Sequence, residues 1–172
     1  MNIYTKTTAH GFNDLTDFND GTLNNWMPRL PEYNDKGQLN WAVAKEMDEY
    51  HSFDNNVLYI PTRDNDNAGT VVSKKYELDE SRVYEFSVTV FRLTSITSPQ
   101  LSLRVGFSGK DCADDVILCQ GEPVATQETT MVCYYQPGKH GNYLKIHNSV
   151  ATGIGNDYAI IAIGVKDVGG GC

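Results

Sequence analysis

The residues of this sequence that could carry out nucleophilic, metal or redox chemistry are scattered along the chain. No two of its four cysteines and four histidines stand at the Cys-x-x-Cys or His-Glu-x-x-His spacing that builds a metal site. No Gly-x-Ser-x-Gly nucleophile motif occurs, and the abundant acidic residues form no pattern that singles out a glycosidase pair. The chain is therefore predicted not to be an enzyme.

The cysteines allow more than one interpretation. Cys112 and Cys119 bracket a short acidic segment, Cys-Ala-Asp-Asp-Val-Ile-Leu-Cys. They could close a small disulfide loop in an oxidising compartment or stay as thiols in a reducing one, and both interpretations stay open. Cys133 lies in an apolar run and is interpreted as a small buried residue. Cys172 follows a run of glycines and is placed on a tail.

The charge of the chain restricts its partners. Asp and Glu outnumber Lys and Arg by 22 to 14, which gives a formal net charge of −8 and an isoelectric point near 4.8. Such a chain repels phosphate backbones and anionic lipids, so nucleic acid is not expected as a partner. Membrane insertion is not expected either, because no apolar run approaches the roughly 18 residues of a membrane-spanning helix. Neutral glycans, cations and basic proteins stay open as partners.

Two segments show the alternation of apolar and polar residues that is typical of half-buried β-strands. In residues 82–93 one face carries Tyr84, Phe86, Val88 and Val90. In residues 99–108 one face carries Leu101, Leu103, Val105 and Phe107. Arg104 falls on the opposite face of the second segment. The connection between the two segments is short and polar, which favours their antiparallel pairing.

The rest of the chain follows the same pattern. Further strands are predicted at residues 38–47, 57–61, 70–78, 126–136, 143–147 and 158–168. Asn-, Asp-, Gly- and Pro-rich turn sequences separate them, and no segment of about ten residues has helical periodicity. This spacing predicts an all-β fold, a two-sheet antiparallel β-sandwich of the jelly-roll type. The length of 172 residues suits one domain, predicted over residues 1–168, with a flexible Gly-rich tail over 169–172.

Three segments occur in a characteristic order along the chain. The first is Asp-Phe-Asn-Asp-Gly-Thr-Leu-Asn-Asn-Trp at 17–26. The second begins with Asn-Val-Leu-Tyr-Ile at 56–60 and leads through 68–73 and 76–78 into Val-Tyr-Glu-Phe-Ser-Val at 83–88. The third is Tyr-Ala-Ile-Ile-Ala-Ile-Gly-Val-Lys-Asp-Val at 158–168. In this order they resemble the galactose-binding-like jelly-roll carbohydrate-binding modules that accompany bacterial glycoside hydrolases. The resemblance covers nearly the whole chain.

The resemblance also implies a structural calcium ion between the opening strand and the last strand. Calcium takes six to eight oxygen ligands, and the candidates are Asp17, Asn19, Asp20 and Asp167. Asn19 stands where such modules usually have Glu, and Lys166 stands where an acid is common. A turn with solvated side chains is the alternative interpretation of these residues. The acidic stretch 64–67 lacks the Gly and distal Glu of an EF-hand loop and is interpreted as a surface turn.

A glycan site needs an exposed aromatic ring, which stacks on the C–H face of a sugar, and nearby polar groups that bind its hydroxyls. The concave face of a sheet and the loop edge of the sandwich both stay open as its location. The residues predicted to bind carbohydrate are Trp41, Tyr50, Arg104, Tyr135 and His147. Tyr135 is chosen from the pair Tyr134 and Tyr135, of which one ring must point inward and the other outward. Trp26 is interpreted as a core residue.

The predicted function is that of a non-catalytic, lectin-like module that recognises a polysaccharide or a cell-surface glycan. An adhesion or toxin-associated domain of the same fold, with a protein or glycoconjugate receptor, is the alternative, and a purely structural β-sandwich is a third possibility. An extracellular or cell-surface location in a bacterium is expected. The N-terminal stretch shows no apolar core of a signal peptide. The chain is thus expected to follow a removed signal, to belong to a larger multidomain protein, or to leave the cell by another route.

Overall fold

The computed structural model describes residues 11–49, 51–63, 67–94, 96–150 and 156–170. Within these ranges the chain forms eleven strands and no helix. The strands are β1 (Asn13–Thr16), β2 (Met27–Pro28), β3 (Ala42–Glu46), β4 (Ser52–Ile60), β5 (Gly69–Lys75), β6 (Arg82–Arg92), β7 (Leu101–Gly106), β8 (Val116–Gly121), β9 (Glu128–Tyr135), β10 (Tyr143–Asn148) and β11 (Tyr158–Gly170). In this part of the chain no helix exists that could cross a membrane.

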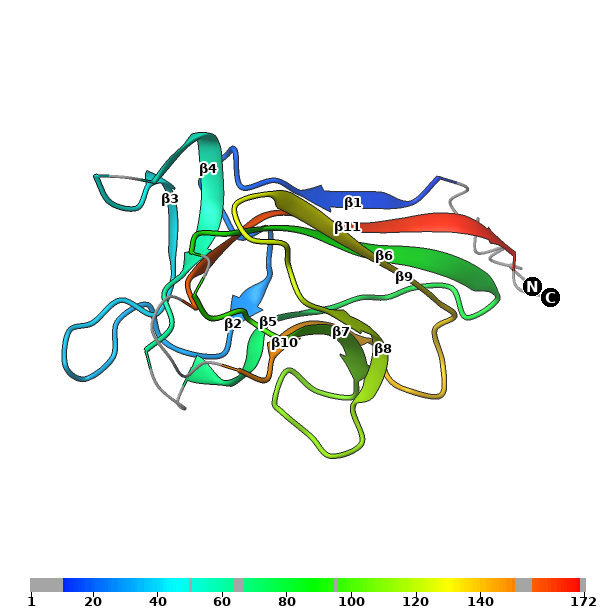
Figure 1. Cartoon of the computed structure of the whole chain (residues 1–172). Helices are drawn as coiled ribbons and strands as arrows, with labels where there is room; N and C mark the ends of the chain where they lie inside the picture. The colour runs from blue at the N-terminus through cyan, green and yellow to red at the C-terminus, as the bar shows by residue number, and fades with distance from the viewer. Residues whose placement is uncertain (1–10, 50, 64–66, 95, 151–155, 171–172) are drawn as a thin grey trace, which may run out of the picture.

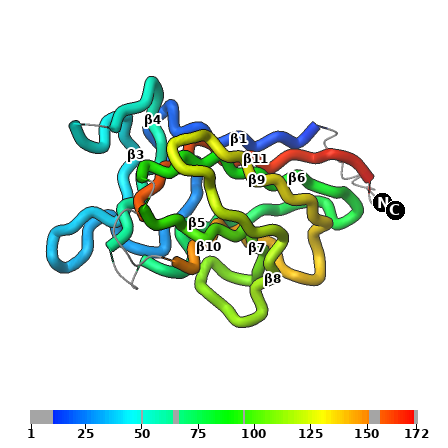
Figure 2. The backbone as a smooth tube through the Cα atoms, viewed as in Figure 1, coloured from blue at the N-terminus to red at the C-terminus, as the bar shows by residue number. Residues whose placement is uncertain are grey.

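The strands form two antiparallel sheets that face each other (Figure 1, Figure 2). Sheet A has the order β3-β4-β11-β6-β9, and β1 also pairs with β11. Sheet B has the order β2-β5-β10-β7-β8. This arrangement confirms the predicted two-sheet β-sandwich.

The core lies between the sheets, because the side chains of each strand alternate between the core and the outside. Phe86, Val88 and Val90 of β6 are fully buried there, as the alternation predicts. The indole of Trp26 is 2% exposed and stacks on Phe86, with ring centroids 6.1 Å apart and an interplanar angle of 12°. Trp26 is thus a core residue, which confirms its interpretation.

The predicted pairing of the two most regular strands is wrong. β6 lies between β11 and β9 in sheet A, whereas β7 lies between β10 and β8 in sheet B. Each strand buries its apolar face against the shared core, one from each side. The short connection between them therefore crosses from one sheet to the other instead of closing a hairpin.

Strand ends and short strands also differ from the prediction. Alternation predicted neither β1 nor β2, which have four and two residues, nor β8, whose apolar residues do not alternate strictly. The predicted tail starts too early, because Gly169 and Gly170 pair with Val83 and Arg82 as the end of β11. Cys172 lies outside the described residues.

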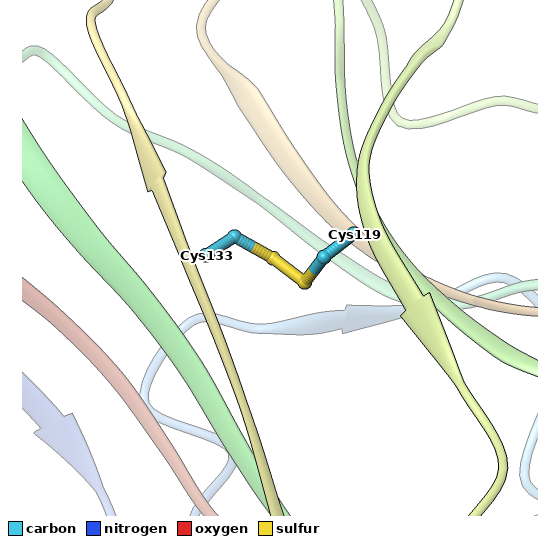
Figure 3. The surroundings of a disulfide bond; sticks show 2 residues. All are labelled: Cys119 and Cys133. Atoms are coloured by element: carbon cyan, nitrogen blue, oxygen red, sulfur yellow. A yellow bond between two sulfur atoms is a disulfide. The ribbon is translucent and has the colours of Figure 1, made fainter.

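A disulfide joins the sheets near one edge of the sandwich (Figure 3). It links Cys119 of β8 to Cys133 of β9, with the two Cα atoms 5.8 Å apart. Cys112 is a free, exposed thiol. The suggested bridge between Cys112 and Cys119 is therefore wrong. Cys133 points into the core from sheet A, so Cys119 on the facing strand β8 pairs with it and not with Cys112, the cysteine nearest to Cys119 in the sequence.

Candidate functional site

The candidate site lies on the outer face of sheet B, which points away from the core. Ser73 of β5, Lys145 of β10 and Arg104 of β7 occupy one row across this face. The loop of residues 107–115 connects β7 to β8 on the side of sheet B away from sheet A (Figure 1). Contacts of this loop with β5 and β10 show that it folds back across the row.

A buried ion pair fixes the loop to the sheet. The Nζ of Lys145 donates to both carboxylate oxygens of Asp115 at 2.8 Å and also to the carbonyl of Lys110. The Lys145 and Asp115 side chains are 0% and 2% exposed. Gly106 allows this approach, because a Cβ at this position would lie 2.2 Å from Asp115 Oδ1. The loop is therefore anchored where it covers β10.

Asp111, four residues before Asp115 in the same loop, connects the loop to strand β5. Its Oδ1 accepts hydrogen bonds from the backbone N–H and the hydroxyl of Thr70 at 2.8 and 2.5 Å. Its carboxylate also lies 3.7 Å from Nε of Arg29 and 3.9 Å from Nε2 of His147. Arg29 in turn donates to the carbonyls of Thr70 and Ala68. Side chains from three strand regions and the loop thus form one polar network.

The network shifts the pKa values of two of its members. Burial raises the pKa of Asp111, but the hydrogen bonds from Thr70 and the nearby His147 and Arg29 outweigh it, so this pKa lies below its ordinary value. Burial lowers the pKa of His147, and the charge of Arg104 lowers it further. At neutral pH the network therefore contains a carboxylate and a neutral imidazole.

A groove of about 610 Å³ lies beside this network. It is lined by the β2 edge, by β5, by loop residues 109–111 and by Tyr143 of β10. Tyr143 is half-buried and supplies the aromatic ring of the groove. Gly109 packs closely here, since a Cβ on it would lie 2.8 Å from Ser73 Oγ and 3.9 Å from Tyr143 Cε1. A partly exposed ring among hydrogen-bonding groups can bind a polyhydroxylated ligand without any bond being made or broken.

Three of the five predicted carbohydrate-binding residues lie around the network. His147 belongs to it, and Arg104 lies on the same face and acts on the His147 pKa. Trp41 is half-buried and lines a small crevice together with Arg29. Tyr50 lies outside the described residues.

The choice of Tyr135 as the outward-pointing ring is wrong. Tyr135 is 9% exposed and packs on Tyr84 in the core, with ring centroids 6.1 Å apart. Cys133 and Tyr135 share the inner face of β9, so Tyr134 points outward and is 62% exposed. Tyr134 belongs to the outer face of sheet A, on the opposite side of the sandwich from the groove.

The structure does not gather the four residues chosen for calcium, Asp17, Asn19, Asp20 and Asp167. The backbone N–H of Asp167 donates to Phe12 just before β1, whereas the other three follow the end of that strand. The Asp167 carboxylate accepts hydrogen bonds from the Arg82 guanidinium. Asp17 and Asp20 accept local hydrogen bonds from Asn19 and Thr22. No group of three or more His, Cys, Asp or Glu side chains is arranged for a metal ion in the described part of the chain.

An internal ammonium group beside β1 was not foreseen. The Nζ of Lys74 donates to Asp14 Oδ2 at 2.8 Å and to the carbonyl of Asn24 at 2.6 Å. The hydroxyl of Tyr76 donates to the same Asp14 oxygen at 2.7 Å. Burial raises the pKa of Asp14, but these hydrogen bonds outweigh it and keep the pKa below its ordinary value. The Lys74 ammonium group is therefore a cation of the protein itself that is held in place beside β1.

Sequence reasoning also missed Arg29, Asp111 and Tyr143. A signal was available for Tyr143, because it precedes Leu144 and Ile146 in a predicted strand and must point away from Leu144. Arg29 follows a strand of only two residues, and Asp111 reaches the site through the fold of its loop. Nothing in the spacing of either residue points to the site.

We expect the variant His147→Gln to reduce the loss of stability on mild acidification. Because the pKa of His147 is lowered in the folded protein, the unfolded chain binds more protons just below its ordinary value of about 6.5. The free energy of unfolding therefore falls as pH decreases from about 6.5 toward the folded pKa, and the variant lacks this contribution. Urea unfolding at several pH values measures the difference. An NMR midpoint for the His147 imidazole at or above about 6.5 contradicts the prediction.

No protein-family model matches the sequence, and no curated protein matches it. Solved structures match over most of the chain. The CBM22-1 xylan-binding domain of Xyn10C from Paenibacillus barcinonensis aligns with a TM-score of 0.65 and 14% identity, covering 91% of this chain and 94% of that one. The C-terminal family 22 carbohydrate-binding module of Xyn10B from Clostridium thermocellum gives 0.56 and 13%, covering 89% and 91%. The C-terminal domain of EclA, a sugar-binding protein, gives 0.51 and 23%, covering 90% and 99%. The chain therefore has the jelly-roll β-sandwich fold of carbohydrate-binding modules.

Proposed function

We propose that this protein is a non-catalytic carbohydrate-binding module whose glycan lies in the groove beside β2 and β5. The observation that carries the proposal is the groove itself, which combines the Tyr143 ring with charged and hydroxyl side chains. The shared fold with modules described as xylan-binding and sugar-binding supports it. The alternative of a receptor-binding domain has no comparable observation in its favour.

The groove is suited to equilibrium binding on a preformed surface. Arg29 and Asp111 are already held by hydrogen bonds to β5, and the buried Lys145–Asp115 pair fixes the loop that carries Asp111. Groups that are fixed before binding lose little conformational entropy when the ligand arrives. In this proposal Tyr143 stacks on a sugar ring, and the polar network selects the hydroxyl pattern.

The disulfide supports the extracellular or cell-surface location that the sequence predicts. Disulfides persist in oxidising compartments and are rare in the cytosol. A place within a larger protein is supported by the Clostridium thermocellum structure that joins a CBM22-1 module to a GH10 module. The present protein aligns with only 25% of the Clostridium thermocellum chain, with a TM-score of 0.54 and 14% identity. We propose that the domain directs a larger extracellular protein to its glycan.

Replacing Tyr143 by alanine should weaken glycan binding by at least ten-fold, because central aromatic residues dominate the binding energy of such sites. The measurement is isothermal titration calorimetry with the best ligand found on a glycan array. Tyr134→Ala is the matched control. It removes an exposed tyrosine from the outer face of the other sheet and should leave affinity unchanged.

The fold of each variant is checked by urea unfolding, so that a loss of binding is not confused with a loss of structure. If Tyr143→Ala stays folded and binds as the wild type does, the groove is not the site. If the array shows no binding and a protein receptor is captured specifically through the groove, the receptor-binding alternative replaces the proposal.

A further inference from the structure

The groove is positively charged on a chain that is acidic overall. Among the described residues that line it, four are cationic and one is acidic. The cations are Arg29, Lys74, Lys75 and Lys110, and the acid is Asp111. The whole chain has a net charge of −8, so the rest of the surface is more acidic still. Charge is thus segregated, and the proposed ligand site has the opposite sign from its surroundings.

Not all of these charges are equally available to a ligand. Lys74 is held by Asp14, with an Nζ to Oδ2 distance of 2.8 Å. Lys75 lies 3.5 Å from Glu77, but both side chains are more than half exposed. Such surface pairs contribute little and exchange readily. Lys75 can therefore turn toward a ligand at small cost.

Lys110 is the most available cation. Its residue is exposed, and within the described chain it takes part in none of the salt bridges. The acid beside it, Asp111, is already occupied by two hydrogen bonds from Thr70. The wall formed by the loop thus offers an unpaired ammonium group and a carboxylate whose Oδ1 already accepts two hydrogen bonds and whose Oδ2 lies 3.7 Å from Arg29 Nε.

The acidity of the remaining surface does not cancel this local charge. At physiological ionic strength the Debye length is about 8 Å, so acids on distant faces are largely screened at the groove. Lys75 lies directly opposite Tyr143 in the β5–β10 ladder, which places a cation next to the stacking ring. A sugar stacked on Tyr143 would therefore lie in the same groove as the cations Lys75, on the neighbouring strand, and Lys110, on the loop.

We infer that the glycan bound in this groove is anionic and carries a carboxylate, as a uronic acid does, or a sulfate ester. The inference rests on the proposed function, because it names the ligand class of the same groove. Charge-assisted hydrogen bonds from Lys110 and Lys75 would hold the anion. The acidic surroundings would repel polyanions such as nucleic acids, which leaves a sparsely charged glycan as the ligand that fits.

The test compares three oligosaccharides by calorimetry at 50 and 300 mM salt. They are a xylo-oligosaccharide that carries one glucuronic acid, the same molecule with its carboxyl reduced to an alcohol, and a sulfated counterpart. We expect the acid or the sulfate ester to bind about ten-fold more tightly than the reduced form. The double variant Lys75→Gln/Lys110→Gln should remove most of this preference. Lys45→Gln, an exposed lysine of β3 in the other sheet, should leave it unchanged.

The outcomes separate the two proposals. Equal affinity for the acidic, sulfated and reduced oligosaccharides overturns the anionic preference and leaves glycan binding intact. A preference that survives in the double variant also overturns it, because the anion is then held elsewhere. Binding of none of the three and silence on a broad glycan array overturn both proposals. Tighter binding of the sulfated form than of the uronate supports the inference and identifies the ester as the anion.

Discussion

The variant Lys145→Met should lower the free energy of unfolding by about 3–5 kcal/mol. The ammonium group of Lys145 is completely buried and donates to both oxygens of Asp115. Methionine has a similar length but no charge, so the variant leaves a carboxylate that is 2% exposed without its cation. Removing one partner of a buried pair costs far more than the pair itself contributes. Urea unfolding of the wild type and the variant measures the difference.

Two controls make this result specific. Lys166→Met removes a half-exposed lysine whose Nζ lies 3.5 Å from Glu85 on the surface, and it should change the free energy of unfolding by less than about 1 kcal/mol. The double variant Lys145→Met/Asp115→Leu should recover most of the loss, because neither charge is then left unpaired. A single variant that costs less than about 1 kcal/mol would show that Asp115 reaches water and that the loop is not anchored as described.

The anchored loop also shows why the site was harder to predict than the fold. Alternation in 82–93 and 99–108 identified β6 and β7, because burial of one face of a strand leaves a periodic pattern in the sequence. That pattern does not say which sheet a strand joins, and the pairing of β6 with β7 was wrong for this reason. The role of Lys145 in holding the loop could not be predicted, because a lysine on the outward face of a strand is normally expected to be in solvent. Only the fold of loop 107–115 over β10 buries it.

The residues of the candidate site differ in how far the local sequence reveals them. Arg104 was found because strand alternation places its side chain outward, which is a local property, and His147 was named from its residue type. Asp111 joins them through contacts made 41 residues away along the chain, at Thr70. Trp41 could be named from its residue type, but not its position beside Arg29. The choice between Tyr134 and Tyr135 required knowing which ring faces the other sheet. Two adjacent tyrosines in one strand give no sign of which of them points inward.

The second large effect is expected from the disulfide between Cys119 and Cys133. Replacing both cysteines by alanine should lower the free energy of unfolding by about 3 kcal/mol, because the bridge closes a loop of about 15 residues and restricts the unfolded chain. The two residues are 14 apart in sequence and tie β8 of sheet B to β9 of sheet A. For a domain of this size the melting temperature should fall by about 6–12 °C.

Cys112→Ala is the matched control for this double variant. Cys112 is a free, exposed thiol, so its replacement should leave the melting temperature unchanged. Peptide mapping of the unreduced protein should recover the fragments with Cys119 and Cys133 joined, and a reductant should lower the wild-type melting temperature to that of the double variant. A fragment joining Cys112 to Cys119 would contradict the bridge.

The bridge and the buried ion pair both act on the loop that carries Asp111 and Lys110. The bridge links the two sheets at the β8–β9 edge, and the Lys145–Asp115 pair fixes the loop that precedes β8. Together they determine how firmly this loop holds Asp111 and Lys110 at the groove. We therefore expect the variant that lacks Cys119 and Cys133 to bind glycan more weakly than the wild type near its melting transition. At low temperature the ion pair alone still holds the loop, so the affinity of this variant should equal that of the wild type.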